Sequence, residues 1–167
     1  MRKEIRLKGY DYSGAGYYFV TICVKDGHEL FGEIVGAASC RPQPSSNPSQ
    51  TFSYLQLTPA GNIVETEIAI LLCAYANVTV DKYVVMPNHV HMIICVGGDG
   101  RQNAAPTLSR IIGQWKRAIS IKLGFSPWQR SYHDHIIRDE PEYHRIRQYI
   151  DENPATWTED QYYVAKQ

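Results

Sequence analysis

The chain has 167 residues, of which 44% are hydrophobic and 20% are charged, and its formal net charge is zero. This length and composition predict one soluble globular domain over residues 1–167, and the chain is too short for two domains. No apolar run approaches the ~20 residues that span a membrane, so we expect no membrane segment and a cytoplasmic location. The four cysteines include no CxxC pair, which argues against a thiolate zinc site and against a disulfide framework.

The first third of the chain predicts three strands and one loop. Residues 17–24 are rich in aromatic and β-branched side chains, which is typical of a buried strand. Residues 30–35 indicate a shorter strand, and residues 52–57 indicate a return strand that pairs with it. Between these two, residues 36–51 are dense in Ser, Pro, Gln and Asn, so we expect a flexible loop insertion without a chemical role.

A helix and two strands come next. Thr58 and Pro59 are the residue types expected at a helix N-cap and at the first helical position. Apolar residues then recur at helical spacing to about Tyr75. Residues 78–85 and 89–96 predict two strands joined by a tight connection that contains a proline and an asparagine.

The last third predicts two helices separated by one strand. Thr107 is expected to cap a helix that Gly124 ends. Residues 132–137 indicate a strand. A final helix is expected to begin at Pro141 and to end near Asn153, because the proline that follows disfavours helical geometry in the residue before it.

The order of these elements predicts the fold class. Strand, helix, strand, strand, helix and strand form the split βαβ arrangement of a ferredoxin-like α+β sandwich with an antiparallel sheet. The pair of strands at 30–35 and 52–57 adds a hairpin arm, and the helix after Pro141 is an additional C-terminal helix.

The segment His89-Val90-His91 is the sharpest local feature. Side chains two apart in a strand share a face, so both imidazoles point the same way. Two imidazoles on one rigid face provide half of a divalent-metal site, although a pair of structural histidines has the same pattern. A second pair, His133 and His135, lies on another predicted strand. These histidines can either add metal ligands or form hydrogen bonds with the core or with a nucleic acid.

Tyr149 and Asn153 are four residues apart on the last predicted helix, so they lie on one helical face. A tyrosine hydroxyl is a weak nucleophile at its ordinary pKa near 10, and it attacks effectively when a metal polarises the target phosphate. The asparagine can offer a carbonyl oxygen to that metal.

Charge is unevenly distributed along the chain. Between residues 101 and 138 there are seven basic residues against Asp134 alone, a net charge of +6. A net charge of zero for the whole chain is low for a protein that binds nucleic acid, but a basic band of this kind suits a phosphate backbone. A solvated helix face accounts for the same pattern equally well.

In this order and spacing the features resemble the HUH endonucleases with a single catalytic tyrosine. Within them the chain is similar to the transposases of the insertion-sequence-200 type, and most of all to the REP-associated tyrosine transposases. The residues that carry the resemblance are 84–91, 108–116, 128–138 and 149–157. The resemblance implies a ferredoxin-like fold and strand transfer on single-stranded or hairpin DNA, either REP-like or from a transposon end, in the bacterial nucleoid.

The resemblance also implies roles for individual residues. His89, His91 and Asn153 would hold a divalent metal, Mg²⁺ or Mn²⁺. Tyr149 would form a 5′-phosphotyrosine and release a 3′-hydroxyl. The residues implied to contact DNA are Arg110, Lys116, Arg117 and Arg138. The relatives include both monomers and homodimers that exchange the tyrosine helix, so either state is compatible with the sequence.

Two other functions remain open at this point. The first is a nucleic-acid-binding domain that has lost catalysis, because a ferredoxin-like sheet with aromatic strands is a familiar platform for nucleic acid. The second is a metal-dependent hydrolase in which His133 and His135 join His89 and His91 and water is the nucleophile. Tyr149 is required by strand transfer and is dispensable in both alternatives.

Overall fold

A computed structural model describes residues 15–36, 53–97 and 107–165. Its main sheet has four antiparallel strands in the order β4-β5-β1-β6. The bounds of these strands are β1 Gly16–Cys23, β4 Val78–Val85, β5 His89–Val96 and β6 His133–Ile137. This order, with one helix between β1 and β4 and another between β5 and β6, is the split βαβ topology. The predicted α+β ferredoxin-like fold is therefore confirmed.

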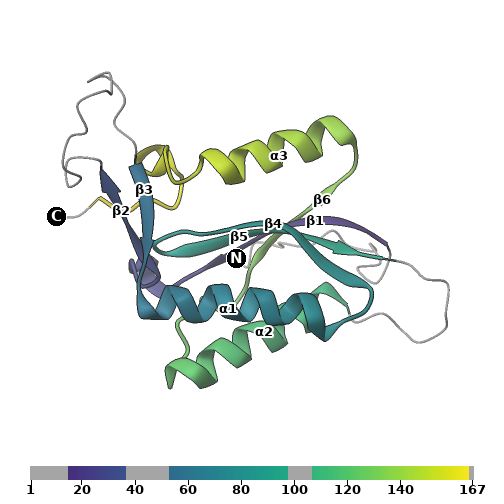
Figure 1. Ribbon diagram of the computed structural model, residues 1–167, viewed down its shortest axis with the longest axis horizontal. Helices are drawn as coiled ribbons and strands as arrows, with labels where there is room; N and C mark the ends of the chain where they lie inside the picture. Colours follow the sequence, from purple (N-terminus) through teal and green to yellow (C-terminus); the bar gives the residue numbers. More distant parts are fainter. Residues whose placement is uncertain (1–14, 37–52, 98–106, 166–167) are drawn as a thin grey trace, which may run out of the picture.

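Three helices cover the two faces of this sheet. The helices α1 (Pro59–Ala74) and α2 (Leu108–Leu123) lie side by side on one face, and α3 (Glu140–Glu152) lies on the other, as Figure 1 shows. No helix in the described part of the chain is both long enough and apolar enough to cross a membrane. The additional C-terminal helix thus lies on the face opposite α1 and α2.

The predicted hairpin arm is also present. Strands β2 (Gly32–Gly36) and β3 (Ser53–Leu57) pair antiparallel in a separate two-stranded sheet. The loop insertion expected at 36–51 begins at the last residue of β2, and residues 37–52 lie outside the described residues. Two short 3-10 helices complete the elements, η1 at Lys25–Gly27 and η3 at Trp157–Glu159.

The alternation of side chains along β5 separates the core from the face that carries the histidines. Val90, Met92 and Ile94 point toward α1 and α2 and belong to the main hydrophobic core. His89 and His91 point to the opposite face, beneath α3, and both are fully buried. The strand is central and covered on both sides, so these two imidazoles are held rigidly.

Side-chain caps fix the beginnings of the three helices. The hydroxyl groups of Thr58 and Thr107 accept hydrogen bonds from backbone N–H groups three residues later, as predicted. The last helix begins at Glu140, one residue earlier than expected, because the Asp139 carboxylate accepts from the N–H of Glu142. Such caps satisfy N–H groups that have no partner inside the helix.

The first turn of α1 packs against the backbone that leads into the hairpin arm, and Gly61 allows this contact. A Cβ atom at Gly61 would overlap the carbonyl group of Phe31. We expect Gly61→Ala to lower the free energy of unfolding by about 2–4 kcal/mol, measured by urea denaturation. Gly113→Ala is the matched control, since a Cβ there meets nothing within 4 Å and should stabilise α2 by about 0.5–1 kcal/mol. Equal effects of the two substitutions would contradict this explanation.

Candidate functional site

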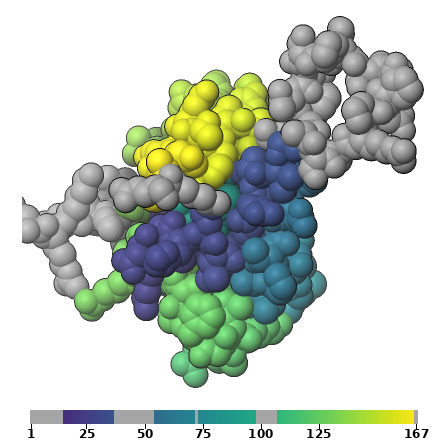
Figure 2. Space-filling view, turned by 90° about the vertical axis from the view of Figure 1, so that its left-hand side faces the viewer, coloured from purple at the N-terminus to yellow at the C-terminus, as the bar shows by residue number. Residues whose placement is uncertain are grey.

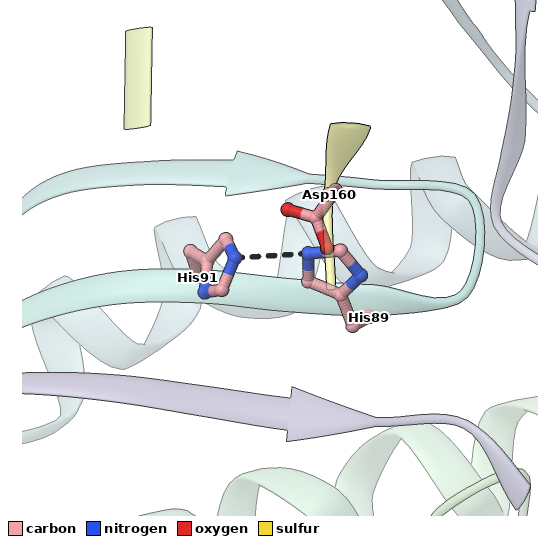
Figure 3. A group of neighbouring side chains, drawn as sticks. All are labelled: His89, His91 and Asp160. Carbon is pink, nitrogen blue, oxygen red and sulfur yellow. Dashed lines mark hydrogen bonds between the residues drawn. The ribbon is translucent and has the colours of Figure 1, made fainter. Parts of the chain in front are cut away.

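The site begins with the two histidines at the start of β5. In the sheet register His89 lies opposite Cys23 and His91 lies opposite Thr21, both on β1. The Nε2 atoms of the two imidazoles are 2.9 Å apart, as the dashed line in Figure 3 marks. Each ring therefore directs its Nε2 atom toward the Nε2 atom of the other ring.

Neighbouring polar groups hold each imidazole in place through its other nitrogen. His89 Nδ1 donates to Asn88 Oδ1 at 2.8 Å, which leaves a lone pair on Nε2, because an amide oxygen only accepts. Asn88 is itself fixed, since its Nδ2 donates to the carbonyl groups of Gly27 and Tyr162 at 3.2 and 2.8 Å. His91 Nδ1 lies 2.8 Å from Thr21 Oγ1. Such partners are the usual supports of histidines that bind metals.

Asp160, from the segment after η3, brings a carboxylate to the two histidines. The ligand atoms of His89, His91 and Asp160 lie within 4.8 Å of one another, and Figure 3 shows the carboxylate beside the imidazoles. Reasoning from sequence missed this residue. The sequence offers one indication of it, an acidic residue a short distance after Tyr149 and Asn153. Acidic residues at such positions are too common to predict a metal ligand.

The residues present fit a divalent cation. Two nitrogens that each lie about 2.1 Å from one ion, with a nitrogen–ion–nitrogen angle of about 90°, are about 3.0 Å apart. This separation is close to the 2.9 Å between the two Nε2 atoms. Two imidazoles and one carboxylate are common ligands of first-row divalent metals. A further buried oxygen, Asn153 Oδ1, accepts no hydrogen bond from the described residues. A buried oxygen without a hydrogen-bond donor is compatible with a role as a metal ligand.

Tyr149 places its hydroxyl group at the edge of this cluster. The oxygen is 3.2 Å from His91 Nε2 and donates a hydrogen bond to Asp160 Oδ2 at 2.9 Å. The same carboxylate oxygen accepts from Asn153 Nδ2 at 2.5 Å. The structure thus brings together the four residues singled out from sequence, His89, His91, Tyr149 and Asn153, and Asp160 bonds to the last two of them.

Burial sets the charge of these groups. Burial lowers the pKa of His89 to about 4, although the Asp160 carboxylate acts in the opposite direction. Burial, and then the adjacent His89, hold the pKa of His91 well below its usual range. The pKa of the Tyr149 phenol is raised above its ordinary value by burial and then by Asp160. Both imidazoles are therefore neutral at pH 7, the form that binds metals, and the phenol keeps its proton.

These shifts predict how the stability of the metal-free protein depends on pH. The folded-state pKa of His89 lies below its unfolded value of 6.5, so the unfolded chain binds more protons between those values. The free energy of unfolding should therefore fall by about 3 kcal/mol from pH 7 to pH 4 on account of His89. The measurement is urea unfolding in EDTA across this range. His89→Gln should show a shallower pH dependence, and an identical slope in both proteins would contradict the assignment.

The second histidine pair does not join the cluster. His135 Nε2 bonds to Glu142 Oε1 at 2.8 Å, at the surface beside α3. His133 is exposed, with its ring centre 6.5 Å from that of Tyr162. Both lie on β6, which is separated from β5 by β1. A four-histidine metal site finds no support in this arrangement.

The four basic residues implied to contact DNA lie in three places. Arg110 is exposed in the first turn of α2, and Arg117 is exposed two turns further along the same helix. Arg138 is exposed just after β6. Lys116 is half-buried, and its ammonium group donates to two carbonyl groups of the α2–β6 connection at 2.7 and 3.2 Å. DNA contact by these residues stays a prediction.

Comparisons with known proteins agree with this fold. No protein-family model matches the chain. A Haemophilus influenzae protein named "Uncharacterized protein" is 33% identical over 184 residues, covering 98% of this chain and 93% of that protein. The solved structure of a REP-associated tyrosine transposase bound to a REP hairpin has a TM-score of 0.63 and 18% identity, over 94% of this chain and 74% of that chain. The likeness confirms a fold of the tyrosine transposase type.

Proposed function

We propose that this chain cleaves and rejoins single-stranded DNA through Tyr149. The chain belongs to the same family as the Haemophilus influenzae protein, and it has the fold of a REP-associated tyrosine transposase. One observation carries the proposal. The Tyr149 hydroxyl lies 3.2 Å from the ring nitrogen that His91 offers to a metal, within a single chain. A nucleophile beside a metal ligand is the arrangement that phosphodiester transfer needs.

His89, His91 and Asp160, with Asn153 as a further oxygen ligand, would hold the cation. Between the two cations expected from sequence, imidazole ligands favour Mn²⁺ over Mg²⁺, which prefers oxygen. When bound, such a cation polarises the scissile phosphate and stabilises the leaving oxygen.

The chain's own residues orient and supply the nucleophile. The Tyr149 oxygen attacks phosphorus as its proton passes to Asp160, the bond from phosphorus to the 3′-oxygen breaks, and that oxygen takes up a proton from water and leaves as a 3′-hydroxyl. The hydrogen bond from the phenol to Asp160 Oδ2 sets the direction in which the phenol proton departs. Attack of another 3′-hydroxyl on the phosphotyrosine then rejoins DNA and restores the phenol. The contact of Tyr149 with His91 within one chain supports a site formed by a single copy.

The proposal is tested by covalent trapping. The protein is incubated with a library of hairpin oligonucleotides that have randomised single-stranded flanks, labelled at the 5′ or 3′ end, with Mn²⁺ or with EDTA. We expect an adduct that resists denaturation, forms only with Mn²⁺, and carries only the 3′-labelled segment. Cleavage without an adduct would favour a hydrolase, and binding without cleavage would favour a silent binding domain; either result overturns strand transfer through Tyr149.

A further inference from the structure

A basic surface pocket lies beside the end of β1, outside the site already described. Its volume is about 390 Å³. One lining residue follows β1, three belong to α2, and the rest come from the α2–β6 connection. The lining residues are Lys25, Lys116, Arg117, Ser120, Ser126, Trp128, Gln129 and Arg130. In Figure 2 the purple surface near the end of β1 meets the green surface of α2, and the backbone N–H of Lys25 donates to the Pro127 carbonyl group at 2.8 Å.

Among the described residues, no acidic side chain pairs with the exposed cations of this pocket. Lys25, Arg117 and Arg130 are all exposed, and no acidic residue lines the pocket. In the part of the chain that the structure describes, none of the three forms an ion pair. Elsewhere basic residues do have acidic partners, as Arg147 has in Asp81 at 2.9 Å and Lys122 in Glu67 at 2.5 Å. Three unpaired cations around one hollow attract an anion.

The walls of the pocket are held rigidly before any ligand arrives. The Lys116 ammonium group donates to the carbonyl groups of Gln129 and Ser131, and Trp128 Nε1 donates back to the Lys116 carbonyl group at 3.1 Å. Trp128 is 2% exposed and forms an isolated β-bridge with Val24. Lys116 thus has a structural part in the pocket, because its hydrogen bonds hold the backbone of the α2–β6 connection in place. A preformed site loses less entropy when it binds.

The pocket is a short distance from the histidines along the backbone. Cys23, the residue opposite His89, comes two residues before Lys25. Between them the N–H of Val24 donates to the Asn88 carbonyl group at 2.8 Å. The end of β1 thus connects the residue opposite His89 to the wall of the pocket through two residues of backbone.

We propose that the pocket formed by Lys25, Arg117 and Arg130 binds a backbone phosphate of the DNA strand that is processed at Tyr149. This inference rests on the proposed function and adds a second anchoring point to it. Guanidinium groups suit the purpose because they donate two parallel hydrogen bonds to a phosphate and stay charged at any physiological pH. Contact with phosphate rather than with base edges positions the strand without reading its sequence.

The test is the salt dependence of DNA binding, measured by fluorescence anisotropy with a labelled hairpin oligonucleotide that has single-stranded flanks. Each lost phosphate contact lowers the slope of log Kd against log salt by about 0.7 on single strands, which weakens binding about fivefold at ~0.1 M salt. We therefore expect Arg117→Gln and Arg130→Gln each to have this effect, and Arg117→Lys and Arg130→Lys to restore most of it. Arg145→Gln is the matched control, because this exposed arginine on α3 already pairs with Glu142 at 3.7 Å.

Three outcomes would overturn the inference. The first is that the pocket variants and Arg145→Gln give equal slopes. The second is that wild type binds the oligonucleotide with no salt dependence. The third is that Arg117→Gln loses affinity for inorganic phosphate while its slope with DNA equals that of wild type, which would indicate a site for free phosphate alone. Failure of the proposed function differs from these, because the adduct would then be missing from wild type while the slopes of the variants still differed.

Discussion

Tyr149→Phe is expected to abolish the covalent protein–DNA adduct completely, while DNA binding and folding stay unchanged. The substitution removes only the oxygen that lies between His91 and Asp160 and keeps the ring. That ring packs edge-on against Phe19 with centroids 6.1 Å apart, a contact that phenylalanine preserves. Loss of the adduct would therefore reflect the missing nucleophile. The measurement is denaturing electrophoresis of the trapping reaction in Mn²⁺.

Tyr163→Phe is the matched control for this experiment. Tyr163 lies in the same C-terminal segment as Asp160, but among the described ring contacts it packs against Trp157, with centroids 5.4 Å apart, and not against either histidine. Removing its hydroxyl group should leave adduct formation at the wild-type level. Cleavage by Tyr149→Phe at an undiminished rate would show that water, not the phenol, attacks the phosphate. The hydrolase would then be the better explanation.

His91→Ala is expected to weaken Mn²⁺ binding by about 100-fold or more, because it removes one of the two proposed nitrogen ligands. The affinity is measured by the electron paramagnetic resonance signal of free Mn²⁺ during titration, which does not depend on DNA or on turnover. Since His91 is fully buried, the variant should first be shown to fold, by thermal unfolding in EDTA. His91→Gln keeps more of the side-chain volume and should also lose the metal.

His135→Ala is the matched control for metal binding. This exposed histidine belongs to the second His-x-His pair and bonds to Glu142 rather than to the cluster. Its removal should leave the affinity for Mn²⁺ unchanged. Equal losses in His91→Ala and His135→Ala would mean that both pairs serve one metal and would contradict the site built on His89, His91 and Asp160.

Local patterns in the sequence predicted the fold and the face of β5 that carries the two histidines of the candidate site. The alternation of β5 is a property of neighbouring residues, so it predicts that Val90 and Met92 face the core while His89 and His91 share the other face. Helix caps are equally local, because Thr58 and Thr107 act on N–H groups three residues away. The chain order of the elements was enough to predict the split βαβ sheet, which the structure confirms.

Contacts between distant segments were decided by the tertiary structure alone. Asp160 reaches His89 only because the chain turns back after α3 through η3. The pattern of apolar residues in the sequence does not predict that turn. Lys116 is expected from the sequence to contact DNA, and only the tertiary structure shows that its ammonium group bonds to carbonyl groups 13 and 15 residues later. His133 and His135 have the same local pattern as the pair on β5, and only the strand order separates them from it. A periodic pattern tells which way a side chain points, whereas its partners depend on how the whole chain packs.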